Sequence, residues 1–149
     1  MHMTTAPVEA QDPPPVAEES EADTVLVPTG PAQPDIYLAD LSSFDGLHYL
    51  SNLENVTNRP YVYDNQPAFT PDSESLLYTA AYDDGNDGQT DIHRYYLASR
   101  RVTRVTRTDE SEYSAASIPN DRAITVIRVE ADSVQRLWRM TLEGMNAEL

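Results

Sequence analysis

The acidic run from Asp83 to Asp91 is the densest group of possible metal ligands in the sequence. Carboxylate oxygens spaced around glycine are the ligands that Ca²⁺ takes from loops, so Asp83, Asp87 and Asp91 are weak candidate metal ligands. The spacing departs from the EF-hand pattern, because Gly85 occupies the third position and Arg94 replaces the distal Glu. Asp-Gly and Asn-Gly-type sequences also favour hairpin tips. We therefore predict a hairpin tip here and no metal site.

The other reactive side chains lack a catalytic arrangement. The histidines are His2, His48 and His93, and their spacing is not that of a helical zinc motif. The chain has no cysteine, which excludes disulfides and thiolate chemistry. It also has no Gly-x-Ser-x-Gly elbow and no glycine-rich phosphate loop. We therefore expect no enzyme activity and no cofactor, and we interpret His93 as a packing side chain of a strand.

Charge restricts the choice of partners. The 149 residues include 25 acidic and 10 basic residues, the latter all arginine, and the formal net charge is −15 at pH 7. A surface this negative repels nucleic acid and anionic lipid headgroups, so we expect neither as a partner. No apolar run is long enough to span a membrane. The first residues show neither the basic nor the apolar region of a signal peptide, so we predict none within this chain.

The composition divides the chain into two parts. Residues 1–34 contain seven of the eleven prolines, six acidic residues and no basic one. Such a segment buries too little apolar surface to offset the entropy lost on ordering, and we predict a disordered lead or linker. From residue 35 to residue 149, short runs rich in Tyr, Val, Ile and Thr alternate with turn residues. This part is predicted to be all-β, with strands over 35–41, 75–80, 90–97, 101–106, 123–129 and 135–140.

The predicted strands recur with a nearly constant period. The turn Pro71-Asp72 and the apolar strand after it return 48 residues later at Pro119-Asn120. Val56-Thr57 returns at Val105-Thr106, at a spacing of 49. Asp-Ile pairs begin two strands, at residues 35 and 91. A period of this length with about four strands per unit is typical of β-propeller blades, which stack face to face.

These repeated pieces resemble the Pro-Asp-type repeat of TolB-like β-propellers. The matching segments are residues 65–72, 91–95 and 104–106 within a resemblance that covers about residues 35–142. The family turn continues with glycine, whereas Ser73 stands at that place here. The resemblance implies four-stranded antiparallel blades in a ring of about six.

The blades expected from the repeat are a partial one at 35–57, a second at 58–106 and a third at 107–142. Two to three blades cannot close a ring. The propeller is therefore expected to be incomplete, with its remaining blades in the same longer chain or supplied by self-association. We also expect Glu110, Glu112 and Tyr113 on a loop that leads into an inner strand and faces the channel mouth.

The resemblance implies a non-catalytic binding or scaffold propeller of the bacterial cell envelope, periplasmic or exported, with a protein or peptide partner. One alternative is the N-terminal propeller of a larger enzyme, such as a prolyl-oligopeptidase-like serine peptidase whose catalytic domain would follow Leu149. A third hypothesis is a propeller that binds Ca²⁺ or sugar through the acidic loop 83–91.

Overall fold

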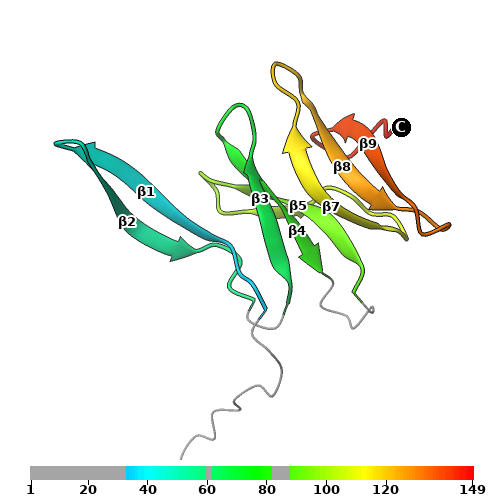
Figure 1. Cartoon of the computed structure of the whole chain (residues 1–149), viewed down its shortest axis with the longest axis horizontal. Helices are drawn as coiled ribbons and strands as arrows, with labels where there is room; N and C mark the ends of the chain where they lie inside the picture. The colour runs from blue at the N-terminus through cyan, green and yellow to red at the C-terminus, as the bar shows by residue number, and fades with distance from the viewer. Residues whose placement is uncertain (1–32, 60–61, 82–87) are drawn as a thin grey trace, which may run out of the picture.

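Three small antiparallel sheets make up the part of the chain that the computed structural model describes, residues 33–59, 62–81 and 88–149 (Figure 1). The first sheet pairs β1 (Tyr37–Phe44) with β2 (Leu47–Asn55). The second has the order β3 (Asp64–Phe69), β4 (Ser75–Ala81), β5 (Thr90–Tyr96) and β6 (Val102–Arg104). The third has the order β7 (Ser111–Ser117), β8 (Ala123–Val129) and β9 (Gln135–Thr141).

The all-β prediction is confirmed, since every regular element in these residues is a strand. None of the described residues belongs to a helix that could cross a membrane. The predicted disordered lead lies outside the described residues except for its last two positions. The predicted domain division at residue 35 stays a prediction.

The second sheet is the centre of the packing, because both of its faces are covered. On one face, Leu77 and Ile92 pack with residues of the third sheet, including Ile124, Val126 and Met140. All five side chains are buried, and each contributes about 1.5–3 kcal/mol through the apolar surface that it removes from water. This face forms the seam between the second and third sheets.

The opposite face of the second sheet covers the base of the first hairpin. There Ile36 packs with Leu76, Tyr78 and Tyr95, and Val56 lies against the same cluster. Since neighbouring positions on β4 point to opposite faces, Leu76 and Leu77 serve the two clusters separately. His93 meets the ring of Tyr78 edge-on at 5.6 Å between centroids, in agreement with a packing role.

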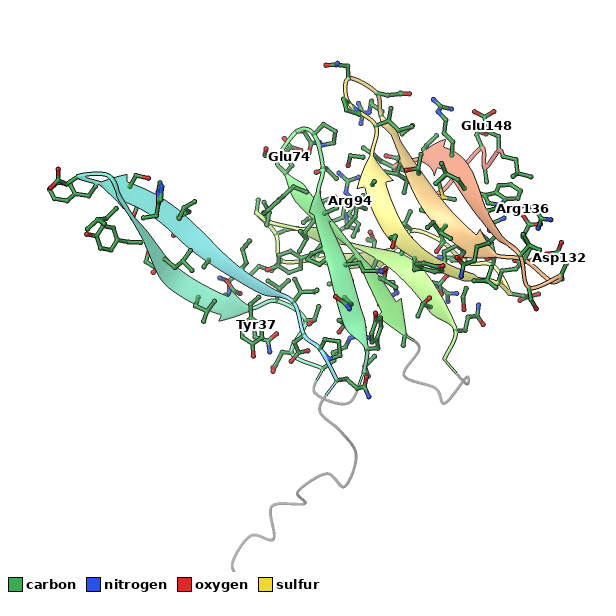
Figure 2. All side chains as sticks on the ribbon, viewed as in Figure 1. Tyr37, Glu74, Arg94, Asp132, Arg136 and Glu148 are labelled. Atoms are coloured by element: carbon green, nitrogen blue, oxygen red, sulfur yellow. The ribbon has the colours of Figure 1, made fainter. Side chains whose placement is uncertain are left out.

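Beyond its base, the first hairpin projects away from the other sheets (Figure 1). Side chains project from both faces of this hairpin (Figure 2). Its large apolar side chains are exposed, namely Leu41, Phe44, Leu47, Tyr49, Leu50 and Leu53. An isolated two-stranded hairpin is at best marginally stable in water. Its stability in the described chain therefore depends on the buried contacts at the base.

The repeat recurs in the backbone. In both β3 and β7 the pairing register shifts at an irregularity, between Asn65 and Ala68 and between Tyr113 and Ala116. Gln66 and Ser114 occupy the same place in the two strands, and each has φ of 54°. The 48-residue period thus repeats a bulge on the first strand of each sheet as well as a turn and an apolar strand.

The Pro-Asp turns differ from each other in detail. The first places Ser73 in the left-handed region with φ of 58°, at the position where the family pattern has glycine. The second places Asn120 there with φ of 61°, one position earlier in the repeat. Left-handed backbone is open to glycine and tolerated by small polar residues, so the substitution keeps the turn while its type changes.

The strands β2, β3 and β7 were not among those predicted from apolar runs in the sequence. Only the expectation of about four strands per repeat implied that further strands exist. β3 and β7 begin with polar residues and contain the bulges, so apolar alternation is interrupted. Glu112 and Tyr113 lie inside β7 rather than on the loop before it, which corrects their predicted placement. Glu110 precedes the strand.

Gly144 gives a direct test of how the third sheet rests on the second. A Cβ at Gly144 would lie 2.1 Å from the carbonyl oxygen of Val105, and the residue has φ of +78°. Gly46, in the tip of the first hairpin, has a similar φ of +75° and nothing within 4 Å. We expect Gly46→Ala to lower the free energy of unfolding by about 1–2 kcal/mol, the cost of left-handed backbone. Gly144→Ala should cost clearly more, because its methyl overlaps main chain.

Urea denaturation of the two variants measures the difference. Equal losses for the two substitutions would contradict the close approach of the C-terminal segment to Val105.

Candidate functional site

The repeated Asp-Ile and Val-Thr pairs form a buried clasp. The Thr106 hydroxyl accepts a hydrogen bond from the Ile92 amide at 2.9 Å and donates one to Asp91 Oδ1 at 3.0 Å. The first hairpin repeats this arrangement: Thr57 accepts from the Ile36 amide at 3.1 Å and donates to an Asp35 oxygen at 3.0 Å. In the second sheet the motif ties the segment after β6 to the start of β5, and in the first hairpin it ties the segment after β2 to the residues before β1. The role of these residues is structural.

Asp91 is therefore directed into the protein. It is 1% exposed, and its Oδ2 lies 2.8 Å from the guanidinium of Arg104. Asp83 and Asp87, the other weak metal candidates, lie outside the described residues. Among the residues that are described, no group of three metal-ligating side chains comes together. The predicted hairpin tip lies mostly in residues outside the described ones, so it stays a prediction, and Ca²⁺ binding by this loop stays an untested hypothesis.

A second buried carboxylate, Glu112 of β7, faces the clasp across the seam. It accepts hydrogen bonds from Thr108 at 2.5 Å and from Arg128 Nε at 2.9 Å, and it is fully buried. Asp64 occupies the equivalent place 48 residues earlier, is also fully buried, and pairs with Arg59. The first residues of β3 and those of β7 thus each include a buried acid that forms an ion pair with an arginine.

The Asp91 carboxyl at the seam has a strongly shifted pKa. Burial, the largest cause, and the nearby charge of Glu112 together raise the pKa of Asp91 to about 7, against the hydrogen bond from Thr106 and the charge of Arg107, which lower it. At neutral pH this carboxyl is therefore partly protonated, whereas an exposed aspartate would have lost its proton.

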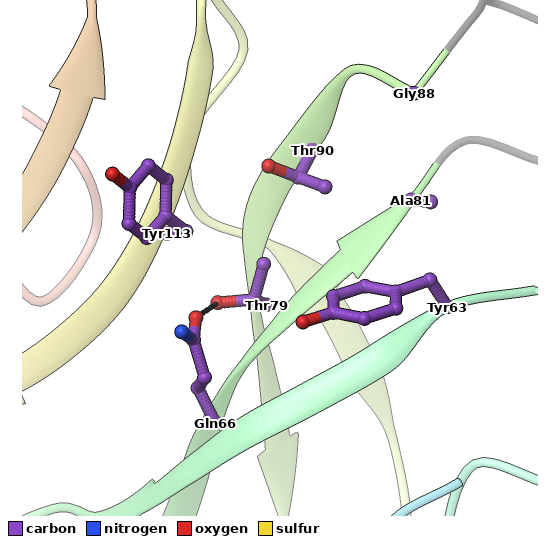
Figure 3. A pocket seen from close by; sticks show the side chains of 7 residues that line it. All are labelled: Tyr63, Gln66, Thr79, Ala81, Gly88, Thr90 and Tyr113. Carbon is purple, nitrogen blue, oxygen red and sulfur yellow. Dashed lines mark hydrogen bonds between the residues drawn. The ribbon is translucent and has the colours of Figure 1, made fainter. Parts of the chain in front are cut away.

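The candidate binding site is a cleft of about 490 Å³ at one end of this seam. Its walls come from the second sheet and from β7, and Figure 3 shows Tyr63 and Tyr113 on either side of the Gln66–Thr79 pair. The residues that line it are Tyr63, Gln66, Thr79, Ala81, Gly88, Thr90 and Tyr113. None of these described lining residues is charged, although the chain as a whole carries a net charge of −15.

Gln66 joins the two sheets at the cleft. Its Oε1 accepts hydrogen bonds from the Thr79 hydroxyl at 2.9 Å and from the Ser114 amide at 3.0 Å. The Thr79 oxygen also receives the Ser114 amide, at 3.2 Å. The bulge at Ser114 turns its N–H toward the second sheet. The side chain of Gln66, which lies at the equivalent bulge of β3, accepts the hydrogen bond from this N–H.

The described residues of the cleft offer hydrogen-bonding groups and aromatic surface, and none of them is a nucleophile beside a base. Its hydroxyls at Thr79 and Thr90 donate to an amide oxygen and to the carbonyl of Glu112, and neither acceptor is a base. Two acids near it, Asp91 and Glu112, are buried and paired with arginines. The described lining holds the phenols of Tyr63 and Tyr113 but no carboxylate, imidazole or amine that could serve as the base of an acid–base pair.

Sequence reasoning identified part of this site. Tyr113, which the sequence placed near the channel mouth, lines the cleft, and so does Tyr63. Gln66, Thr79 and Thr90 were missed, because they come from three strands and share no local motif. The available signal was the 48-residue spacing of Gln66 and Ser114, two polar residues at the same repeat position.

The clasp can be tested by removing one hydroxyl. Thr106→Val keeps the side-chain shape but leaves the Ile92 amide and an oxygen of Asp91 without their partner. We expect the free energy of unfolding to fall by about 1–3 kcal/mol, the cost of unsatisfied buried groups. Thr103→Val is the matched control, since the Thr103 side chain makes no hydrogen bond within the described residues. Equal effects in thermal or urea denaturation would show that the clasp contributes nothing.

The seam also predicts a pH dependence. The pKa of Asp91 is higher in the folded protein, about 7, than its ordinary 3.8, so the folded state binds this proton more tightly. Its stabilising contribution is complete below about pH 4 and is lost as the pH rises to about 7, by up to about 1.4 kcal/mol per pH unit. Asp91→Asn should flatten the fall in unfolding free energy between about pH 5 and about pH 7.

Asp132→Asn is the control for this titration. The hydrogen bond from Arg136 lowers the pKa of Asp132 to about 2, so its removal leaves the slope above pH 5 unchanged. Urea denaturation across this pH range gives the slopes. The same slope for wild type and Asp91→Asn would contradict the shifted titration.

Comparison with known proteins supports the fold. No family model and no curated protein matches the sequence. Among solved structures, the chain is similar to a TolB from Agrobacterium tumefaciens, with 15% identity and a TM-score of 0.56 over 78% of this chain and 49% of that one. It is also similar to TolB from Acinetobacter baumannii, with 24% identity and a TM-score of 0.51 over 78% of this chain and 26% of that one. The chain thus spans about half or less of each structure, and it has the fold of part of a TolB propeller.

Proposed function

We propose that the chain is a non-catalytic binding or scaffold module of a β-propeller in the bacterial cell envelope. The observation that carries this proposal is the cleft at the seam, whose described lining consists of two tyrosines, a fixed amide and threonine hydroxyls, together with Ala81 and Gly88. Tyrosines are frequent in binding sites because they combine a large apolar surface with a hydroxyl. The similarity to TolB structures supports a periplasmic or exported location, which is part of the proposal.

The exposed hairpin supports the proposal that this chain forms only part of a propeller ring. The apolar faces of β1 and β2 extend the surface with which Ile36 and Val56 cover the second sheet. Apolar area of this extent in a propeller-type sheet is normally covered by neighbouring blades. We infer that further blades, from the same longer polypeptide or from other copies, complete the surface, and that the completed ring takes a protein or peptide partner on a surface outside the seam cleft.

The alternative, a propeller that belongs to a prolyl-oligopeptidase-like peptidase, assigns the chemistry to a domain outside this chain. Both functions predict that the purified chain does not hydrolyse peptides or esters, since the described cleft contains no nucleophile beside a base. The measurement is release of a chromogenic leaving group from ester and peptide substrates. Turnover above the rate in buffer would contradict both.

The binding role is tested by photo-crosslinking at the cleft. A photoreactive residue replaces Thr90 in the chain, which is then incubated with a bacterial envelope extract. We expect a discrete crosslinked species that weakens when Tyr63→Ala is added and persists with Tyr49→Ala, an exposed tyrosine of the distant hairpin. Crosslinks that are diffuse, or that ignore Tyr63→Ala, would overturn the assignment of the cleft as the binding site.

A further inference from the structure

We propose that the seam cleft recognises a neutral saccharide, which rests on the proposed binding function and names a ligand class for its site. The first argument is electrostatic. Among the described residues that line the cleft, an anionic ligand would find no cation, inside a chain with a net charge of −15. A cationic ligand would find no carboxylate among these same residues to replace its lost hydration. The described lining therefore favours an uncharged ligand.

Gln66 supplies an oriented donor. Both hydrogen bonds to its Oε1, from Thr79 and from the Ser114 amide, fix the side-chain amide in one orientation. Its Nε2 has no partner among the described residues and is directed away from Thr79 (Figure 3). A donor fixed before binding loses little entropy when it meets an acceptor oxygen, so it favours recognition.

The other polar groups both donate and accept. The Tyr113 hydroxyl has no partner among the described residues, and the Tyr63 hydroxyl accepts from Asn65 at 2.9 Å but keeps its own proton to donate. The Thr90 hydroxyl donates to the Glu112 carbonyl at 2.9 Å and keeps lone pairs to accept. Sugar hydroxyls are the complementary chemistry, because each of them is at once a donor and an acceptor.

The tyrosine rings add an apolar component. Tyr63 borders the cleft from the segment before β3, and Tyr113 borders it from β7. One face of a sugar ring carries mainly C–H groups, which pack against the electron-rich face of an aromatic ring. Two rings on either side of fixed hydrogen-bonding groups are thus suited to a ligand that is polar at its rim and apolar on its faces.

A peptide added as a strand is disfavoured here by the main chain. Strand addition needs consecutive free N–H and C=O groups on an exposed edge, and β3 and β7 are the edges beside the cleft. The bulges interrupt both edges. The Gln66 amide is bonded to Asn65 Oδ1 at 2.7 Å, and the Ser114 amide to Gln66 and Thr79. Recognition must therefore come from side chains.

The test is an NMR titration of the full chain, labelled with ¹⁵N, with cellobiose, maltose and N,N′-diacetylchitobiose at millimolar concentrations. At least one disaccharide should shift the Gln66 side-chain amide and the amides of Thr90 and Tyr113. Tyr113→Ala should weaken its binding about threefold to tenfold, the range expected for loss of one stacked ring. Tyr49→Ala should leave the binding unchanged.

A second variant distinguishes loss of binding from loss of folding in Tyr113→Ala. Tyr113→Phe keeps the ring and removes only the hydroxyl, so a dispersed spectrum with a smaller loss of affinity supports both parts of the site. A neutral proline-rich peptide serves as the competing probe. Shifts at the cleft with the peptide and none with the sugars would overturn the saccharide inference and leave the binding function intact. No shift with any probe would overturn the inference, while the crosslinking experiment decides the binding function separately.

Discussion

The structure depends on the buried clasp between an aspartate, a threonine and a main-chain amide. Thr106 ties the Ile92 amide and Asp91 together, and Thr57 does the same for Ile36 and Asp35. At Thr106 one hydroxyl thereby satisfies groups that would otherwise be buried without partners, at a cost of about 1–3 kcal/mol. Because each clasp joins the segment after the last strand of a sheet to residues at or just before the start of an earlier strand of that sheet, it also fixes where the chain leaves for the next sheet.

The hydrogen bonds of the clasp also help to set the geometry of the cleft. Thr90 immediately precedes the clasped Asp91, and Tyr113 immediately follows the buried Glu112, so each wall of the cleft is one residue from the ionic layer at the seam. Buried ion pairs contribute little net stability, since desolvation offsets their attraction, but they permit few alternative arrangements. The energetic cost of the layer is compensated by the apolar contacts of the seam, and its effect is to fix the positions of groups that bind.

The sequence contained the repeat, the all-β class and the resemblance, because turns and apolar strands are local patterns. Strands β3 and β7 could not be predicted in this way, since the bulges at Gln66 and Ser114 interrupt the alternation on which strand prediction depends. The cleft was even less accessible. Its residues are scattered over four strands and the segments beside them, and the Gln66 bond to Ser114 exists only once two sheets are stacked.

The uneven burial of the three sheets explains why binding belongs at this seam. The first hairpin lacks the two further strands that the second sheet has, and its apolar side chains are open to solvent. A surface of this kind changes whenever other blades cover it, so it cannot define a site within the chain. The seam between the second and third sheets is closed by its own core of Leu77, Ile92 and Ile124. A cleft whose walls are set by that core, by the ionic layer and by the Gln66 bridge has its geometry before any ligand or neighbouring blade arrives, which lowers the entropy lost on binding.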